Sequence, residues 1–319
     1  MKLAALILLS VFISCSSKDA TKSPLVVKTI LPKELKEISG LTAVGTDIWA
    51  ITDKPKSRVF RLDATGKLLQ TVNISNVEAT DVEAVTSDST FIYIADVGDN
   101  IGDRVERKII KVKADGIPAG EEVQVTGETI EFTFPNEEVV ENKQQNNFDC
   151  ESVLSFKDSL YLFTKDREDK ETKLYVIPKI PGKYVARYIS RFDSDGLITD
   201  AALNRQHNEL ALIGYHKGHL YPFILLFTKF RGTDFFSGDH QRIELAKKKW
   251  DWQLEGITYS NKNIVYFSCE GTKEVPATFY GIKRDDIFTL NKERKHKDTG
   301  EETNEEDEPE LSKKGHLKM

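Results

Sequence analysis

Five segments of this sequence share one pattern, in which an acidic residue opens a stretch of small and apolar residues. The acidic residues are Glu37, Glu83, Glu151, Asp200 and Glu255. Successive members are 46, 68, 49 and 55 residues apart. Carboxylates that a fold holds close together repel one another, so the pKa of some members rises or the group binds a cation. The pattern therefore points to metal binding or to acid–base chemistry.

A second set of carboxylates follows the aromatic runs that come next in these segments. Its members are Asp53, Asp96, Asp166 and Glu270, and a glycine-containing polar loop after Asp96 adds Asp99, Asn100 and Arg104. The acid spacing in this loop is not that of an EF-hand. Its glycines favour a hairpin turn, and the role of its acids stays open.

The residue types decide which metal would suit such a group. Ca²⁺ accepts 6–8 oxygen ligands in a loose geometry, which carboxylates and backbone carbonyls supply. Zn²⁺ suits the group poorly, because the sequence has no His or Cys cluster with ligand spacing. His216 and His219 are expected in a solvated loop, and Trp250 and Trp252 are expected to pack between structural units.

The surrounding elements are predicted to be β-strands. Short runs rich in Val, Ile, Phe and Tyr alternate with turn clusters, and each acidic segment continues into an aromatic run and then a third apolar run. Such a repeat fits the blades of a β-propeller, which need about 40–50 residues each. We predict a single all-β propeller of five blades, closed by a strand at residues 25–30. Six blades is the alternative, because the second unit is long enough to hide another.

In a propeller the first strand of each blade lines the central channel. The start of this strand and the end of the antiparallel second strand open on the same face. We therefore expect the first set of acids to converge at one mouth of the channel and Asp53, Asp96, Asp166 and Glu270 to surround it. Three roles remain open for the first set: hydrogen bonds to the backbone of neighbouring blades, metal ligation, or catalysis.

The first 15 residues resemble a bacterial lipoprotein signal. Lys2 precedes a short apolar run, and Ser14 precedes Cys15, which would be acylated. Acyl chains would then anchor the protein to a membrane without a spanning helix. The alternative is an ordinary signal peptide with a chance cysteine. Ser16 after the cysteine favours the outer membrane, with the periplasmic face and the cell surface both open.

The rest of the chain divides into three parts. Residues 16–24 are expected to be a tether, residues 25–292 the propeller, and residues 293–319 a disordered charged tail. The net charge of −6 argues against nucleic acid as a partner. Cys150 and Cys269 fall in units that are not adjacent, so we expect two buried, unpaired thiols.

The segments around Ser39, Glu83 and Asp99 resemble a group of secreted bacterial propellers described as phytase-like, esterase-like or SdiA-regulated. A fainter resemblance is to the calcium-activated apyrases, five-bladed propellers with Ca²⁺ in the channel. That resemblance implies Ser39, Glu83, Glu151 and Glu255 as calcium ligands. No stretch matches the nucleotide-contacting segments of the apyrases.

Three functions follow from these observations. The first is a membrane-anchored envelope module that uses a Ca²⁺-stabilised acidic face to bind a protein or a glycan. The second is a metal-dependent hydrolase of phosphoesters or lactones, with Glu83 or Glu151 as the base. The third is a structural subunit of an outer-membrane complex.

Overall fold

The computed structural model describes residues 25–137, 145–216, 221–245, 253–260 and 263–287. Several predictions concern residues outside these ranges: the expected signal peptide with Cys15, the expected tether and charged tail, His219, Trp250 and Trp252. No helix in the described part of the chain is long and apolar enough to cross a membrane.

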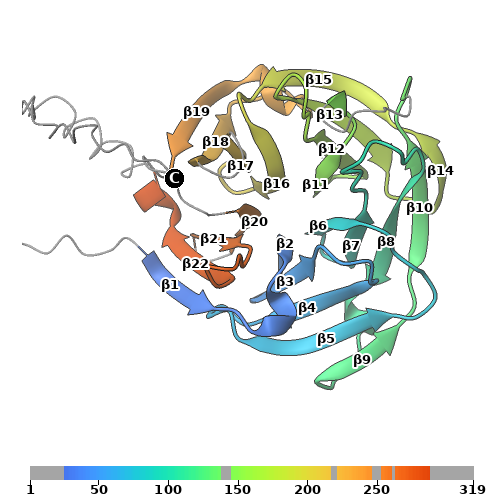
Figure 1. Ribbon diagram of the computed structural model, residues 1–319, viewed down its shortest axis with the longest axis vertical. Helices are drawn as coiled ribbons and strands as arrows, with labels where there is room; N and C mark the ends of the chain where they lie inside the picture. Colours follow the sequence, from blue (N-terminus) through green and yellow to red (C-terminus); the bar gives the residue numbers. More distant parts are fainter. Residues whose placement is uncertain (1–24, 138–144, 217–220, 246–252, 261–262, 288–319) are drawn as a thin grey trace, which may run out of the picture.

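Five β-sheets, each with four antiparallel strands at its centre, stand like blades around a central channel (Figure 1). Blade one contains β2 (Ile38–Val44), β3 (Asp47–Thr52), β4 (Arg58–Leu62) and β5 (Leu68–Ile74). Blade two contains β6 (Val82–Ser87), β7 (Phe91–Asp96), β8 (Arg107–Lys113) and β10 (Glu128–Thr133). Blade three contains β11 (Cys150–Phe156), β12 (Ser159–Thr164), β13 (Glu171–Pro178) and β15 (Arg187–Asp193).

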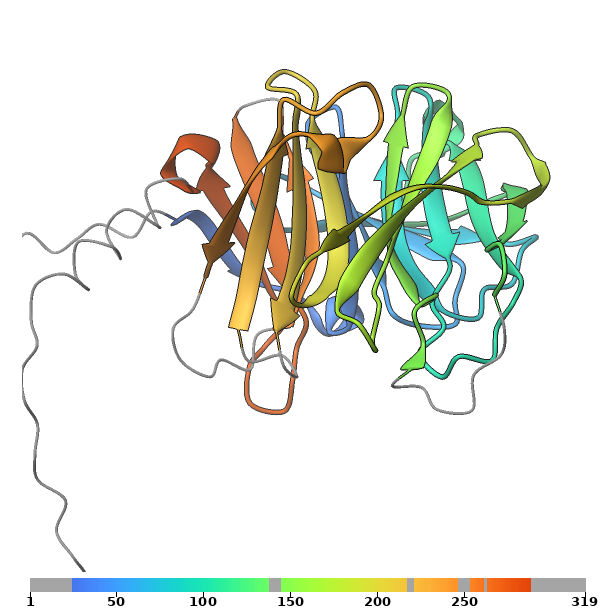
Figure 2. The ribbon, with the colours of Figure 1, turned by 90° about the horizontal axis from the view of Figure 1, so that it is seen from above.

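Blade four contains β16 (Leu197–Asn204), β17 (Glu209–His216), β18 (Tyr221–Thr228) and β19 (Asp239–Glu244). Blade five contains β20 (Leu254–Tyr259), β21 (Ile264–Cys269), β22 (Thr278–Lys283) and β1 (Leu25–Ile30). Single 3₁₀ turns lie at Lys33–Leu35, Ala114–Gly116 and Phe235–Ser237. Seen from the side, the strands run between the two faces of the disc (Figure 2).

The N-terminal strand closes the ring, as predicted. β1 pairs antiparallel with β22 and so completes the sheet whose other three strands come from the C-terminal part of the propeller. This pairing joins the two ends of the ring of blades and covers the outer edge of β22.

The long second unit does not hide a sixth blade. Its extra residues form β9 (Glu122–Val125), which pairs in parallel with β5 of blade one. In the same way β14 (Gly182–Val185), from the third unit, pairs in parallel with β10 of blade two. The additional residues therefore add a fifth, outer strand to blades one and two. In each case this strand comes from the next unit along the chain.

The core consists of five apolar clusters, each between two neighbouring blades. The middle strands of each blade are covered on both faces, so they appear in the sequence as continuous apolar runs rather than as alternating patterns. Cys150 and Cys269 are buried on blades three and five and form no disulfide, as expected. This packing fixes the inner strands that carry the acidic residues.

Candidate functional site: the acidic mouth of the channel

Each of the five inner strands contains a β-bulge near its start. The pairing register with the second strand of the blade shifts at the same point in every blade. A bulge of this kind re-aims the side chain of the extra residue. The residues at the bulges are Ser39, Glu83, Glu151, Thr199 and Glu255.

The bulges correct the predicted ring of five carboxylates. Three blades present a glutamate at the bulge, and two present a hydroxyl. Both hydroxyls bond to the next blade, since Ser39 Oγ donates to the Glu83 carbonyl at 3.1 Å and Thr199 Oγ1 donates to the Leu254 carbonyl at 2.5 Å. The mouth therefore carries less negative charge on its inner ring than the spacing of the acids suggested.

Asp200 lies one residue beyond the bulge, where its carboxylate serves the backbone. It accepts hydrogen bonds from the amides of Ala201 at 2.8 Å, Ile257 at 2.8 Å and Leu41 at 3.3 Å. These bonds join blade four to blades five and one, which is the backbone role considered above. Asp200 does not line the cavity at the acidic mouth. Glu37, two residues before its bulge, does line it and pairs with Lys54 at 3.1 Å.

A cavity of about 250 Å³ occupies this mouth of the channel. The inner-strand side chains in its wall are those of Ser39, Glu83, Glu151 and Glu255, together with Glu37 and Gln253 just before two of these strands. Four second strands each contribute one residue, the one after the partner of the residue that precedes the bulge. These residues are Asp53, Lys165, Tyr215 and Glu270. Asn100 and Arg167 complete the wall.

Of the predicted outer ring, only Asp53 and Glu270 line this cavity. Asp96 is buried and pairs with Arg104 at 2.8 Å, Asp99 is buried and pairs with Arg107 at 3.1 Å, and Asp166 is buried and pairs with Lys173. In blade three the side chain in the cavity wall is that of Lys165, the residue before Asp166. A shift of one residue in a strand turns the side chain to the other face, which explains this error.

Three carboxylates at one side of the mouth form a compact oxygen cluster. One ligand oxygen each from Asp53, Asp81 and Glu83 lies within 4.8 Å of the others. Ser39 Oγ donates to Glu83 Oε2 at 2.9 Å. Gly98 leaves room for the cluster, since a Cβ there would lie 2.5 Å from Asp81 Oδ2. Carboxylate and hydroxyl oxygens suit a hard divalent cation such as Ca²⁺.

Blade three brings to the mouth two cations that the sequence interpretation missed. The ammonium group of Lys165 binds Glu151 Oε2, and both side chains are almost fully buried. Arg167 binds Asp149 and lies 3.6 Å from Glu151 Oε1. The Lys165 ammonium also lies 5.1 Å from the ring centre of Tyr215. The position of Lys165 in the sequence could have identified it as a mouth residue, because it follows its strand just as Asp53 and Glu270 follow theirs.

Burial and repulsion between carboxylates raise the pKa values of three acids at the mouth, Asp81, Glu151 and Glu270. Burial, followed by the charges of Asp53 and Asp149, raises the pKa of Asp81 to about 7. Burial likewise raises the pKa of Glu151 to about 7 despite its contact with Lys165, and the pKa of Glu270 to about 7. The pKa of Lys165 rises too, because neighbouring carboxylates, Glu151 foremost, outweigh its burial. Several carboxyl groups of the metal-free protein therefore titrate near neutral pH.

These shifts make stability depend on pH. The folded protein retains protons on Asp81, Glu151 and Glu270 up to about pH 7, whereas the unfolded chain releases them near its ordinary pKa values of 3.8 and 4.5. Because the unfolded state binds fewer protons in this range, the free energy of unfolding is expected to fall as the pH rises from 5 to 8. Urea unfolding in the presence of EDTA measures this slope, which the Asp81→Asn variant should reduce. A flat or rising profile would contradict the assigned shifts.

No known family model matches the sequence, and no curated protein sequence matches it significantly. Solved structures similar to it include an exo-β-1,3-galactanase from Phanerochaete chrysosporium, with a TM-score of 0.47 and 10% identity over 76% of this chain. This chain spans 59% of the galactanase chain.

Two other similar structures are matched over nearly their full length. A putative glucose dehydrogenase-type oxidoreductase from Thermus thermophilus has a TM-score of 0.41 and 8% identity, over 80% of this chain and 99% of the other. The WD40 propeller domain of Doa1 has a TM-score of 0.39 and 8% identity, over 79% and 95%. Similarities of this degree carry no information on function.

Proposed function

We propose that the protein is a membrane-anchored binding module of the bacterial envelope whose acidic channel mouth holds a divalent cation, with Ca²⁺ the best candidate. The observation that carries the cation site is the oxygen cluster of Asp53, Asp81 and Glu83. Glu83 is almost fully buried, and burial followed by the charge of Glu151 raises its pKa. A bound cation would neutralise these buried carboxylates, which otherwise have to be neutralised by protons.

The anchor belongs to the same proposal and rests on the sequence. Acylation of Cys15 would place the propeller at the outer membrane on a tether of residues 16–24. A cation in the mouth would leave Glu37, Glu255 and Glu270 around it as a polar face for an envelope protein or a glycan. We therefore assign the acidic mouth to binding.

Calcium is expected to bind the full-length protein with one-to-one stoichiometry and to raise its melting temperature. At 100 times the dissociation constant, binding to the folded state alone contributes about 2.7 kcal/mol to stability. The Asp53→Asn/Asp81→Asn variant is expected to lose at least tenfold in affinity, because it removes two anionic ligands. Calorimetric titration at pH 7.5 measures stoichiometry and affinity together.

A matched control is the Asp115→Asn/Asp195→Asn variant, which removes the same charge from side chains that are 72% and 75% exposed. Its affinity for Ca²⁺ should stay within about twofold of the parent, since exposed charges are screened at physiological salt. An equal loss of Ca²⁺ affinity in both variants would show that binding depends only on the net charge of the protein. An absence of Ca²⁺ binding to the parent protein would refute the site.

One feature favours hydrolysis of phosphoesters or lactones as a second candidate. Lys165 and Arg167 line the same mouth as Asp53 and Glu83 of the oxygen cluster, so an anionic group of a substrate could be oriented by these cations. Glu151, with a pKa of about 7, is suited to accept or donate a proton at neutral pH. A Ca²⁺ ion at the oxygen cluster would polarise the bond to be broken. Turnover of a phosphoester or lactone that is lost in Glu151→Gln would identify this activity.

A further inference from the structure

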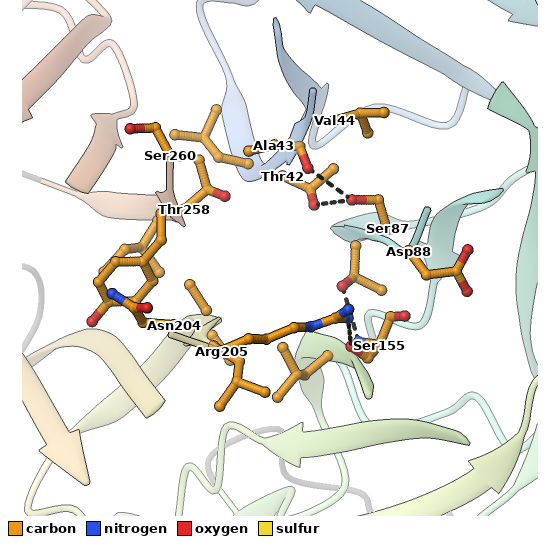
Figure 3. A pocket seen from close by; sticks show the side chains of 18 of the residues that line it. Thr42, Ala43, Val44, Ser87, Asp88, Ser155, Asn204, Arg205, Thr258 and Ser260 are labelled. Atoms are coloured by element: carbon orange, nitrogen blue, oxygen red, sulfur yellow. Dashed lines mark hydrogen bonds between the residues drawn. The ribbon is translucent and has the colours of Figure 1, made fainter. Parts of the chain in front are cut away.

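A second, larger cavity lies at the opposite mouth of the channel. Its volume is about 370 Å³, and its wall is formed by the ends of the five inner strands and the turns after them. At about 30 Å³ per water molecule, this space corresponds to about twelve waters. It falls within the size range of small-molecule sites, about 300–1,000 Å³. Figure 3 shows polar side chains around most of its circumference.

Arg205 is the principal charge in this cavity. Its side chain extends from the end of β16 across the mouth toward β11, where Nη2 donates to the Ser155 carbonyl at 3.0 Å (Figure 3). No carboxylate of the described residues pairs with this guanidinium. Asp88, the acidic residue in the described wall, is already neutralised by Lys179 at 2.8 Å. The cavity therefore carries a positive charge that the described chain does not balance.

The polar groups around Arg205 can donate further hydrogen bonds. Thr86 Oγ1 accepts from the Ser155 amide at 3.0 Å, which leaves its own hydroxyl hydrogen available. Asn204 uses Oδ1 to accept from the amides of Gln206 and His207, so its Nδ2 donors are not engaged by these contacts. The Thr258 hydroxyl has no hydrogen bond to a described residue. The Ser155 hydroxyl is buried and has no partner within the described chain.

The remaining part of the wall is apolar. Leu154, Ala201, Ala202 and Leu203 cover the side formed by blades three and four. The cavity thus combines one unbalanced cation, several hydrogen-bond donors and an apolar side. A guanidinium with a hydroxyl donor beside it matches the oxygens of a carboxylate or phosphate group. The apolar side matches a small hydrocarbon body.

We propose that this mouth binds a small organic anion through a carboxylate or phosphate group held by the Arg205 guanidinium and the neighbouring Thr86 hydroxyl. The apolar part of the ligand packs on Leu154 and Ala202. The site is independent of the cation site, since the two cavities share no lining residue and lie at opposite ends of the channel. The propeller therefore has two mouths of opposite chemistry, one for a cation and one for an anion.

The test titrates the full-length protein with inorganic phosphate, phenyl phosphate, acetate and benzoate, with calorimetry or NMR as the readout. We expect saturable binding of one anion type, tighter for its phenyl derivative because of the apolar side. The Arg205→Gln variant should bind at least tenfold more weakly. The anion type that binds distinguishes a phosphate ligand from a carboxylate ligand.

Two further variants separate the site from general charge and from folding. Arg231→Gln removes an exposed arginine outside this cavity and should leave anion binding unchanged. Arg205→Lys keeps the charge but not the planar fork of donors, and should weaken binding several-fold without lowering the melting temperature, since Arg205 is exposed. The absence of saturable binding for all four probes at millimolar concentrations would overturn the proposal. Equal weakening by Arg205→Gln and Arg231→Gln would also overturn it.

Discussion

The Lys165→Met variant is expected to lose about 3–5 kcal/mol of unfolding free energy at pH 8 without Ca²⁺, because it strands a buried carboxylate. Lys165 binds Glu151, and both side chains are 5% exposed, so water compensates only partly for the lost partner. The charges of Glu255 and Asp149 also act on Lys165. Methionine preserves most of the side-chain volume, so the loss reports charge rather than a cavity. Urea unfolding measures it.

The size of the loss should depend on burial. In the matched control Lys183→Met, the pair with Glu131 at 2.7 Å has side chains that are 76% and 39% exposed, and the expected loss of stability is much smaller, because solvent screens the pair. Adding Glu151→Gln to Lys165→Met should recover part of the stability, since it removes the stranded charge. Calcium should bind the Lys165→Met protein more tightly than the parent, because a competing cation is gone. Similar losses at positions 165 and 183 would contradict a buried ion pair.

The fold was predictable because each blade repeats one physical pattern. Middle strands buried on both faces produce runs such as residues 92–95 and 210–213, and turn residues separate them. The closing role of residues 25–30 was predictable because the fifth repeat unit has no fourth strand of its own before the charged tail. The parallel pairing of β9 with β5 was not predictable, because Glu122–Val125 is short and polar and depends on tertiary contacts.

The candidate site was only partly predictable, because its residues depend on register. The spacing of the acids predicted that Glu83, Glu151 and Glu255 meet at one mouth of the channel, and the structure places all three in the wall of the cavity there. Periodicity cannot reveal a bulge, so Asp200 was aligned one residue away from its structural counterpart Thr199. The same one-residue error placed Asp166 where Lys165 lies and turned a mixed-charge mouth into a purely acidic one.

The loop between β7 and β8 connects the stability of the propeller to its acidic mouth. Asn100 in this loop lines the cavity and binds Arg167. The Asp99 amide donates to Asp149 Oδ1 at 2.9 Å, and Asn146 Nδ2 donates to the Asp99 carbonyl at 2.5 Å. The loop therefore joins blade two to blade three next to the cations of the mouth. The buried side chain of Arg107 holds this loop in place through Asp99 and the Val97 carbonyl.

Replacing that residue, Arg107, by methionine is expected to cost about 3–5 kcal/mol and to weaken Ca²⁺ binding. Arg107 is 1% exposed, and its guanidinium binds Glu137 through both nitrogens at 2.7 and 2.8 Å and Asp99 at 3.1 Å. It also donates to the carbonyls of Val97 at 3.1 Å and Phe148 at 3.0 Å. Methionine leaves two largely buried carboxylates and these carbonyls without their donor. Urea unfolding and calcium titration measure the two effects.

The Arg107→Lys variant separates charge from geometry. Lysine keeps the positive charge but cannot donate in the planar fork that reaches both carboxylates, so an intermediate loss is expected. Arg61→Met is the matched surface control, since Arg61 pairs with Asp47 at 2.5 Å while its own side chain is 41% exposed. That change should cost no more than about 1 kcal/mol and leave Ca²⁺ affinity unaltered. If Arg107→Met lowers stability but leaves Ca²⁺ affinity at the parent value, the loop does not position the mouth, and the cation site depends on the inner strands alone.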